Sequence, residues 1–108
     1  MHAIGAVGAI GPDAKGSIPT LIHLLDGEDY RTAAADALVK IGKDSINALL
    51  EALKHPKWEV RLGAVNALGQ FGADAKKALP ALNILWQRDR SQDVQKAARA
   101  AYQRINAR

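Results

Sequence analysis

RTAAADALVKIG at residues 31–42, RLGAVNALGQFG at residues 61–72 and QKAARAAYQRIN at residues 95–106 are three copies of one segment, and this segment decides the fold. Small and aliphatic residues recur in every copy three or four positions apart, which is the spacing of one face of an α-helix. The shorter stretch HAIGAVGAIG at residues 2–11 fits the same template. Each copy is therefore predicted to be a helix that buries one face.

A second helical segment alternates with the first. It reads SIPTLIHLL from Ser17, SINALLEAL from Ser45 and ALPALNILW from Ala78. In the first two copies the aliphatic residues fall at positions i, i+3, i+4 and i+7, so one face of this helix is also buried. The alternation predicts an all-α fold of seven helices, arranged as three pairs and one unpaired helix at the end.

The helix ends carry the residues expected of caps. Gly42 and Gly72 stand where copies of the first segment end and a positive φ favours glycine. Asp44 or Ser45, and Ser91, are predicted to cap the N-termini of later helices.

A single helix pair is too small to be stable alone. Ordering about 30 residues costs roughly 45 kcal/mol, and offsetting that cost takes some ~1,800 Å² of apolar burial at ~25 cal/mol per Å². One hairpin hides less apolar surface than this, so neighbouring pairs must stack. We therefore expect one domain over residues 1–108 in which helix pairs lie side by side.

Composition excludes several classes of protein. The chain has no cysteine, which excludes disulfides and thiolate metal sites. His2, His23 and His55 lie in different repeats and lack the spacing of metal ligands. No apolar run is long enough to cross a membrane, and no motif pairs a nucleophile with a base or cradles a phosphate. We expect a non-catalytic cytoplasmic protein without a metal or cofactor.

Charge is divided unevenly along the chain, whose net charge is +4. Residues 1–50 hold four basic and six acidic side chains, whereas the remainder holds eleven basic and five acidic ones. An anionic partner would therefore bind the C-terminal half. The candidate contacts to a nucleic-acid backbone are Arg88, Arg90, Lys96, Arg99 and Arg104.

Two longer stretches resemble a known family. IGPDAKGSIPTLIHLL at residues 10–25 and WEVRLGAVNALGQFGADAKKALPALNIL at residues 58–85 are similar to the HEAT-like repeats of bacterial proteins, including the short type named after phycobilisome lyases. The resemblance implies a right-handed α-solenoid, a superhelix of about 3.5 helix pairs, whose second helices line the concave, ligand-facing side. It implies no single activity, although a bilin-lyase role would need a tetrapyrrole pocket.

One step of the family pattern changes along the chain. The family's Val-Arg step at the start of the first helix appears at Arg31, after tyrosine, and at Arg61, after valine, whereas Gln95 replaces the arginine in the last copy. The replacement suggests that an internal contact of the array is no longer needed there.

The predicted binding surface consists of the exposed positions of the second helices. These are Thr20, His23 and Asp26, then Asn47, Glu51 and Lys54, and then Ala81, Ile84 and Gln87. Such mixed chemistry favours a protein or peptide over a phosphate backbone, which would need repeated lysine or arginine. We therefore expect a protein-protein interaction scaffold or assembly subunit that binds its partner on the concave face, with nucleic-acid binding as the alternative.

Each of the two tryptophans has two interpretations. Trp86 takes the place of a leucine and is either an anchor beside Ile84 or a filler of the gap before the last repeat. Trp58 is either a surface anchor or packs on a loop between repeats.

The two ends of the chain differ in polarity. Arg99 stands where the earlier copies have Ala35 and Val65, so the last helix has a polar outer face. The segment His2–Ile10 offers almost nothing polar. We expect it to be covered by further repeats of a longer array or by a second copy, or else to fray; the alternative is a monomer that tolerates an apolar edge.

Overall fold

The computed structural model describes residues 16–107, and every regular element in this range is helical. The α-helices are α2 (Ile18–Leu24), α3 (Arg31–Ile41), α4 (Ile46–Ala52), α5 (Trp58–Phe71), α6 (Leu79–Arg88) and α7 (Gln92–Asn106). Two 3-10 helices, η2 (Lys43–Ser45) and η3 (Gly72–Ala78), lead into α4 and α6. The all-α prediction is confirmed over the described residues. The helix predicted at His2–Ile10 lies outside them, so a total of seven helices stays a prediction.

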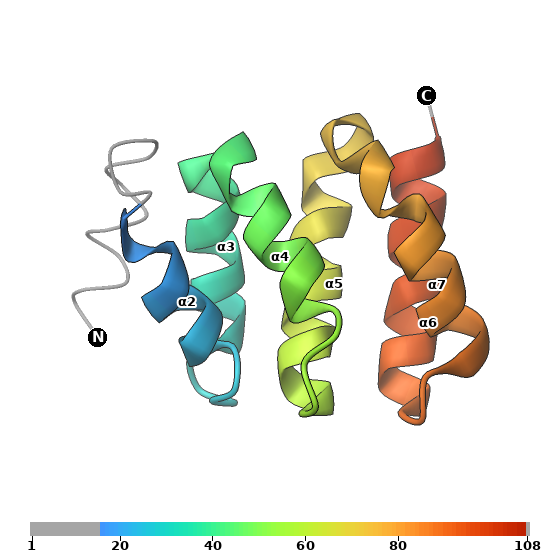
Figure 1. Ribbon diagram of the computed structural model, residues 1–108, viewed down its shortest axis with the longest axis horizontal. Helices are drawn as coiled ribbons and strands as arrows, with labels where there is room; N and C mark the ends of the chain where they lie inside the picture. The colour runs from blue at the N-terminus through green and yellow to red at the C-terminus, as the bar shows by residue number, and fades with distance from the viewer. Residues whose placement is uncertain (1–15, 108) are drawn as a thin grey trace.

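The helices form two layers (Figure 1). We call α2, α4 and α6 the front layer and α3, α5 and α7 the rear layer. Within the rear layer α5 packs on both of its neighbours, and each front helix packs on the rear helix that follows it in sequence. In the front layer α2 packs on α4, whereas α4 and α6 hardly touch. Copies of one sequence segment thus occupy corresponding places in the row.

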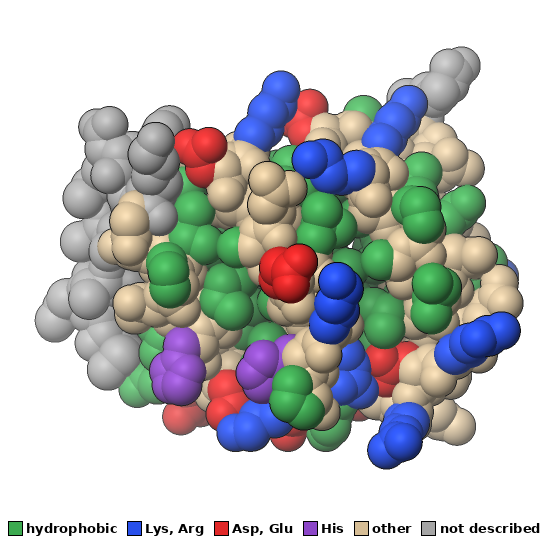
Figure 2. Space-filling view, in the orientation of Figure 1, with side chains coloured by type: hydrophobic (Ala, Val, Ile, Leu, Met, Phe, Trp, Pro, Cys, Tyr) green, Lys and Arg blue, Asp and Glu red, His purple; other side chains and the backbone are tan. Residues whose placement is uncertain are grey.

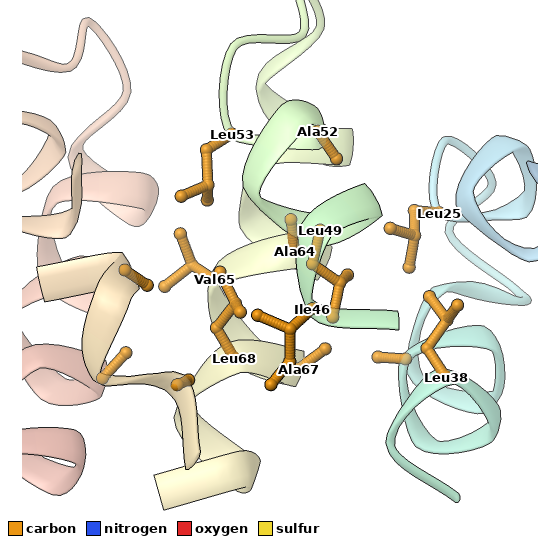
Figure 3. Close-up of a cluster of buried hydrophobic side chains, with 14 of the residues drawn as sticks. Leu25, Leu38, Ile46, Leu49, Ala52, Leu53, Ala64, Val65, Ala67 and Leu68 are labelled. Atoms are coloured by element: carbon orange, nitrogen blue, oxygen red, sulfur yellow. The ribbon is translucent and has the colours of Figure 1, made fainter. Parts of the chain in front are cut away.

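The core lies between the two layers (Figure 3). Leu49 of α4, Leu68 of α5 and Leu38 of α3 are all fully buried in it. The residues that the repeat places on the inner face of the rear helices are buried as predicted: Ala34, Ala37, Leu38 and Ile41, then Ala64, Ala67 and Leu68, and then Ala98, Ala101 and Ile105. The larger aromatic members of the same stripe, Phe71 and Tyr102, are only half-buried.

The predicted caps are confirmed in part. Gly42 and Gly72 have φ values of 100° and 61°, as the ends of α3 and α5 require. Ser91 has an extended backbone with ψ at 125°, and its hydroxyl accepts a hydrogen bond from the Val94 amide at 3.3 Å. The cap predicted at Asp44 or Ser45 is wrong. Ser45 already has a helical backbone with ψ at −19°, so its hydroxyl does not cap α4, and it is buried without a partner among the described residues.

The loop before each rear helix is closed by the same hydrogen bond. Arg31 Nε donates to the Leu25 carbonyl at 3.0 Å. Arg61 Nη1 donates to the His55 carbonyl at 2.8 Å, and Gln95 Nε2 to the Asp89 carbonyl at 2.6 Å. In every case the acceptor lies six residues before the donor. Gln95 therefore keeps the local backward bond of the arginine that it replaces, and the loss of an internal contact of the array there stays a prediction.

Arg61 makes a second contact that joins two loops. Its Nε and Nη2 donate to the two carboxylate oxygens of Asp89 at 2.8 and 3.0 Å, and the two side chains are only 14% and 3% exposed. Burial alone would raise the pKa of Asp89. Hydrogen bonds from Arg61 and from the Ser91 amide, with the charge of Arg61, outweigh burial and lower that pKa below its ordinary value. The bidentate pair fixes the start of α5 to the loop between α6 and α7.

Candidate binding site

The residues predicted for the binding surface lie on the front layer and are mostly exposed. Thr20, His23, Asn47, Glu51, Lys54, Ile84 and Gln87 are exposed, and Asp26, Ala81 and Trp86 are half-buried. Figure 2 shows acidic, basic and histidine side chains mixed over this face, with basic ones gathered around the ends of α4 and α6. The structure therefore places these residues on one layer without making them one continuous site.

Some of these polar residues contact other side chains of the same protein. Lys54 Nζ lies 3.9 Å from a carboxylate oxygen of Glu51. Asn47 Oδ1 accepts a hydrogen bond from Lys77 Nζ at 3.3 Å, and Gln87 Nε2 donates to Asn83 Oδ1 at 2.9 Å. All of these contacts are exposed, so each contributes little to stability and can be exchanged for a contact to a partner.

Two hollows share a wall where the loops that follow α4 and α6 come together. One has a volume of about 460 Å³ and lies between the C-terminal ends of α4 and α6, where Leu53 faces Leu85 and Ile84. The other has a volume of about 380 Å³ and includes Trp58 and Ser91. Both are lined by Pro56, Arg61 and Arg90, so we treat them as one feature, the α4–α6 cleft.

The α4–α6 cleft contains the large apolar side chains that stay exposed in the described part of the chain. Ile84 is 59% exposed and Trp58 is 38% exposed. They line the two hollows that share Arg61 and Arg90. Isolated exposed apolar residues are ordinary on protein surfaces, but two at one cleft indicate a place where apolar groups of a ligand are buried.

The lining of the α4–α6 cleft is electropositive. Lys54, Arg88 and Arg90 are exposed at it, and Arg61 contributes to its floor. The acidic lining residue is Asp89, whose charge is neutralised by its bidentate pair with Arg61. The cleft thus offers uncompensated positive charge beside apolar surface. The sequence indicated Ile84 for a protein interface and Arg88 and Arg90 for anion contacts. Nothing in the repeat pattern indicated that the three lie at one cleft.

Trp86 takes no part in this cleft. Its ring centroid lies 6.0 Å from that of Tyr102 on α7, and the guanidinium of Arg99 lies 5.5 Å from its centroid. Trp86 is therefore engaged with α7, which favours the interpretation that it fills the gap before the last repeat over that of an anchor beside Ile84.

The five basic residues predicted to contact an anion do not share one surface. Arg88 and Arg90 line the α4–α6 cleft. Arg99 stacks over Trp86, and Lys96 is exposed elsewhere on α7. Arg104 lines a hollow of about 420 Å³ in the rear layer, together with Arg31 of α3. Their positions give several local patches in place of the continuous track that a nucleic-acid backbone follows.

His55 lies at the rim of the α4–α6 cleft and helps to shape the turn before α5. Its Nδ1 accepts a hydrogen bond from the Lys57 amide at 3.0 Å, so the ring holds the backbone at the start of that helix. Within residues 16–107, no group of three histidine, aspartate or glutamate side chains is arranged to hold a metal ion. No helix in that range has the length and apolar character needed to cross a membrane.

Comparison with known proteins gives one match. The model of a family described as HEAT repeats matches residues 18–103, from the first residue of α2 into α7. No curated protein matches the chain. No solved structure matches it either. The match covers every helix of both layers in whole or in large part.

Proposed function

Because the chain belongs to the HEAT-repeat family, whose members in general mediate protein interactions, we propose that it is a non-catalytic scaffold or assembly subunit. Its partner is a protein or peptide bound on the front layer. The observation that carries the proposal is that the large exposed apolar side chains, Ile84 on α6 and Trp58 at the start of α5, lie at one electropositive cleft beside that layer. Anchoring apolar residues in a partly polar rim are typical of protein interfaces.

The arrangement of the helices supports a particular form of scaffold. We propose a right-handed α-solenoid over residues 1–108 with the front layer on the concave side. The packing of α5 on both rear neighbours supports the stacked row, because each unit then obtains its core from the units on either side, whereas the concave side of the front layer stays a prediction. The likeness to the short bacterial type named after phycobilisome lyases, the association through His2–Ile10 and the cytoplasmic location stay predictions.

Photo-crosslinking tests the proposal. A photoreactive amino acid is placed at Thr20, Asn47 or Gln87 on the front layer, and in matched controls at Thr32, Asn66 or Gln103 on the rear layer. All six residues are exposed, so the variants keep the fold. In cells of the source organism we expect protein adducts at the front positions and none at the rear ones. Equal adducts on both layers, or none on the front layer, would contradict the proposal.

Nucleic-acid binding has weaker support, because its five basic residues lie on separate patches. A titration of salt separates it from the main proposal. Contact with about five phosphates predicts a slope of roughly −4 to −5 for log K against log salt concentration. We expect a flat dependence for any residual binding of an oligonucleotide.

A further inference from the structure

We propose that the α4–α6 cleft binds an extended peptide segment of a partner protein in which acidic side chains stand between two bulky apolar ones. This inference rests on the proposed function and adds the chemistry of the partner. It assigns Trp58 and Ile84 to the apolar groups of the peptide, and Lys54, Arg88 and Arg90 to its carboxylates.

The apolar part of the argument comes from the two hollows. Each has a volume that accepts one bulky side chain, about 460 Å³ beside Ile84 and about 380 Å³ beside Trp58. Leu53 is almost fully buried beneath the first hollow, and Leu85 is half-buried there, so the surface next to Ile84 is aliphatic. Two hollows that share one wall and each hold one exposed apolar side chain fit two anchors of the same short segment.

The positive charge of the cleft indicates that the polar residues of the bound segment are acidic. Arg88 and Arg90 form no ion pair within the described residues, and the ion pair of Lys54 with Glu51 is exposed and 3.9 Å long. Asp89 does not offset these cations, because Arg61 already neutralises it. Carboxylates placed between the anchors would form charge-assisted hydrogen bonds with the cations and would speed association.

The fixed floor of the cleft favours a preformed site. Arg61 donates to both oxygens of Asp89 and to the carbonyls of His55 and Pro56, so the two loops that form the cleft are joined through one side chain. A site held in this way loses little conformational entropy when a ligand binds.

A peptide fits these observations better than a single-stranded nucleic acid. Binding of bases relies on a series of aromatic side chains for stacking, whereas this cleft presents one tryptophan and an isoleucine. Its cations surround the two hollows and do not continue as a track, since Arg99 and Arg104 lie at other places.

Selection from a displayed library of random 12-residue peptides tests the inference. The full chain is the bait, and enriched peptides are labelled and measured by fluorescence anisotropy. We expect enrichment of sequences with aspartate or glutamate between leucine, isoleucine or aromatic residues. We expect Ile84→Asp, and the double variant Arg88→Glu and Arg90→Glu, each to weaken binding by at least about tenfold.

Matched controls separate the cleft from general charge. Lys40→Glu with Lys76→Glu changes the net charge by the same amount at exposed positions outside the cleft, and we expect binding within about twofold of the wild type. Thermal unfolding of all variants should occur within about 2 °C of the wild type, because the changed side chains are exposed. Enrichment of basic or uncharged peptides, no enrichment over the bare support, or equal weakening by the control pair would overturn the inference. Displacement of the peptide by a lower concentration of a dT 12-mer would also overturn it in favour of a nucleic acid.

The two proposals fail in different ways. Front-layer adducts that persist in the Ile84→Asp and Arg88→Glu/Arg90→Glu variants would leave the scaffold function standing and refute the acidic peptide in the cleft. Peptide binding that depends on the cleft, without any front-layer adduct in cells, would refute the scaffold function as the biological role.

Discussion

Two junctions between rear helices use arginines at the same repeat position but differ in the contacts that these arginines make. At the junction of α3 with α5, Arg31 bonds back to the Leu25 carbonyl, and the loops on either side are linked by Lys57 Nζ and Asp26 Oδ2 at 2.8 Å. At the junction of α5 with α7, Arg61 makes the corresponding backward bond and also forms the bidentate pair with Asp89. The first link is exposed and the second is nearly buried.

A repeat specifies the contacts that are made within one copy. The backward bond recurs because donor and acceptor belong to the same copy. The forward bond depends on what the next loop offers, and the position that corresponds to Asp89 one copy earlier is His55, which has no carboxylate. Arg31 therefore has no equivalent acid to reach. The junction with the buried pair is also the one beneath the α4–α6 cleft, so stability and the candidate site coincide there.

The largest effect is expected from Arg61→Met. Removing this guanidinium leaves the carboxylate of Asp89 nearly buried without its partner, which destabilises the fold by about 3 kcal/mol. Arg31→Met is the matched control, because it loses one hydrogen bond to a carbonyl and costs about 1 kcal/mol. Urea unfolding of both variants measures the difference. Equal losses would mean that the two junctions are energetically alike.

A somewhat smaller effect is expected from Gly63→Val in α5. A Cβ at Gly63 would lie 2.8 Å from Leu25 Cδ2 and 3.2 Å from Arg31 Cγ, so a larger side chain pushes α5 away from the α3 junction. Overpacking of this kind costs about 1–3 kcal/mol. Asn66→Val lies on the exposed side of the same helix and controls for the β-branched residue. A Gly63→Val protein as stable as the Asn66→Val protein would show that the junction yields easily.

The α5–α7 junction should be weakened at acid pH, where Asp89 becomes protonated. The folded-state pKa of Asp89 is lowered, so its pair stabilises the fold fully above the unfolded-state pKa of about 3.9, and that contribution is lost as the pH falls through the folded-state pKa. We expect the urea midpoint to fall more steeply below about pH 4 in the wild type than in an Arg61→Met/Asp89→Leu double variant. Parallel pH profiles would argue against a role for this pair.

The smallest effect is expected from Lys57→Ala at the α3–α5 junction. A hydrogen bond from the Lys57 side chain lowers the pKa of Asp26. Burial opposes this shift in part, and the positive charge of Lys57 adds to it. The side chains of Lys57 and Asp26 are 58% and 37% exposed, so salt screens the pair. We expect the melting temperature of Lys57→Ala to approach that of the wild type in 1 M NaCl. The loss caused by Arg61→Met should persist at this salt concentration.

The sequence predicts the elements that repeat. Leu38 and Leu68 stand at one repeat position and are both fully buried, and the exposed positions of α2, α4 and α6 follow from the same alignment. Ser91 caps α7 as predicted because it precedes the helix with an extended backbone, whereas Ser45 is the last residue of a 3-10 helix that no cap signature reveals.

The sequence does not predict features that arise between copies. Arg61 and Asp89 are 28 residues apart, and their pairing has no counterpart in the other copies that an alignment would show. The α4–α6 cleft depends on how far two front helices separate, which periodicity does not encode. Trp86 was ambiguous for the same reason, since its contact with Tyr102 spans the junction to the last copy.

The backward bond that closes each loop has a consequence for how such a gene changes. Its donor and acceptor are six residues apart in all three cases, so a duplicated or deleted unit carries the whole bond with it. A recombination event between α3 and α5 breaks no buried charge pair, whereas one that separates α5 from the loop after α6 divides Arg61 from Asp89. Gain or loss of repeats should therefore be tolerated at the α3–α5 junction and selected against at the α5–α7 junction.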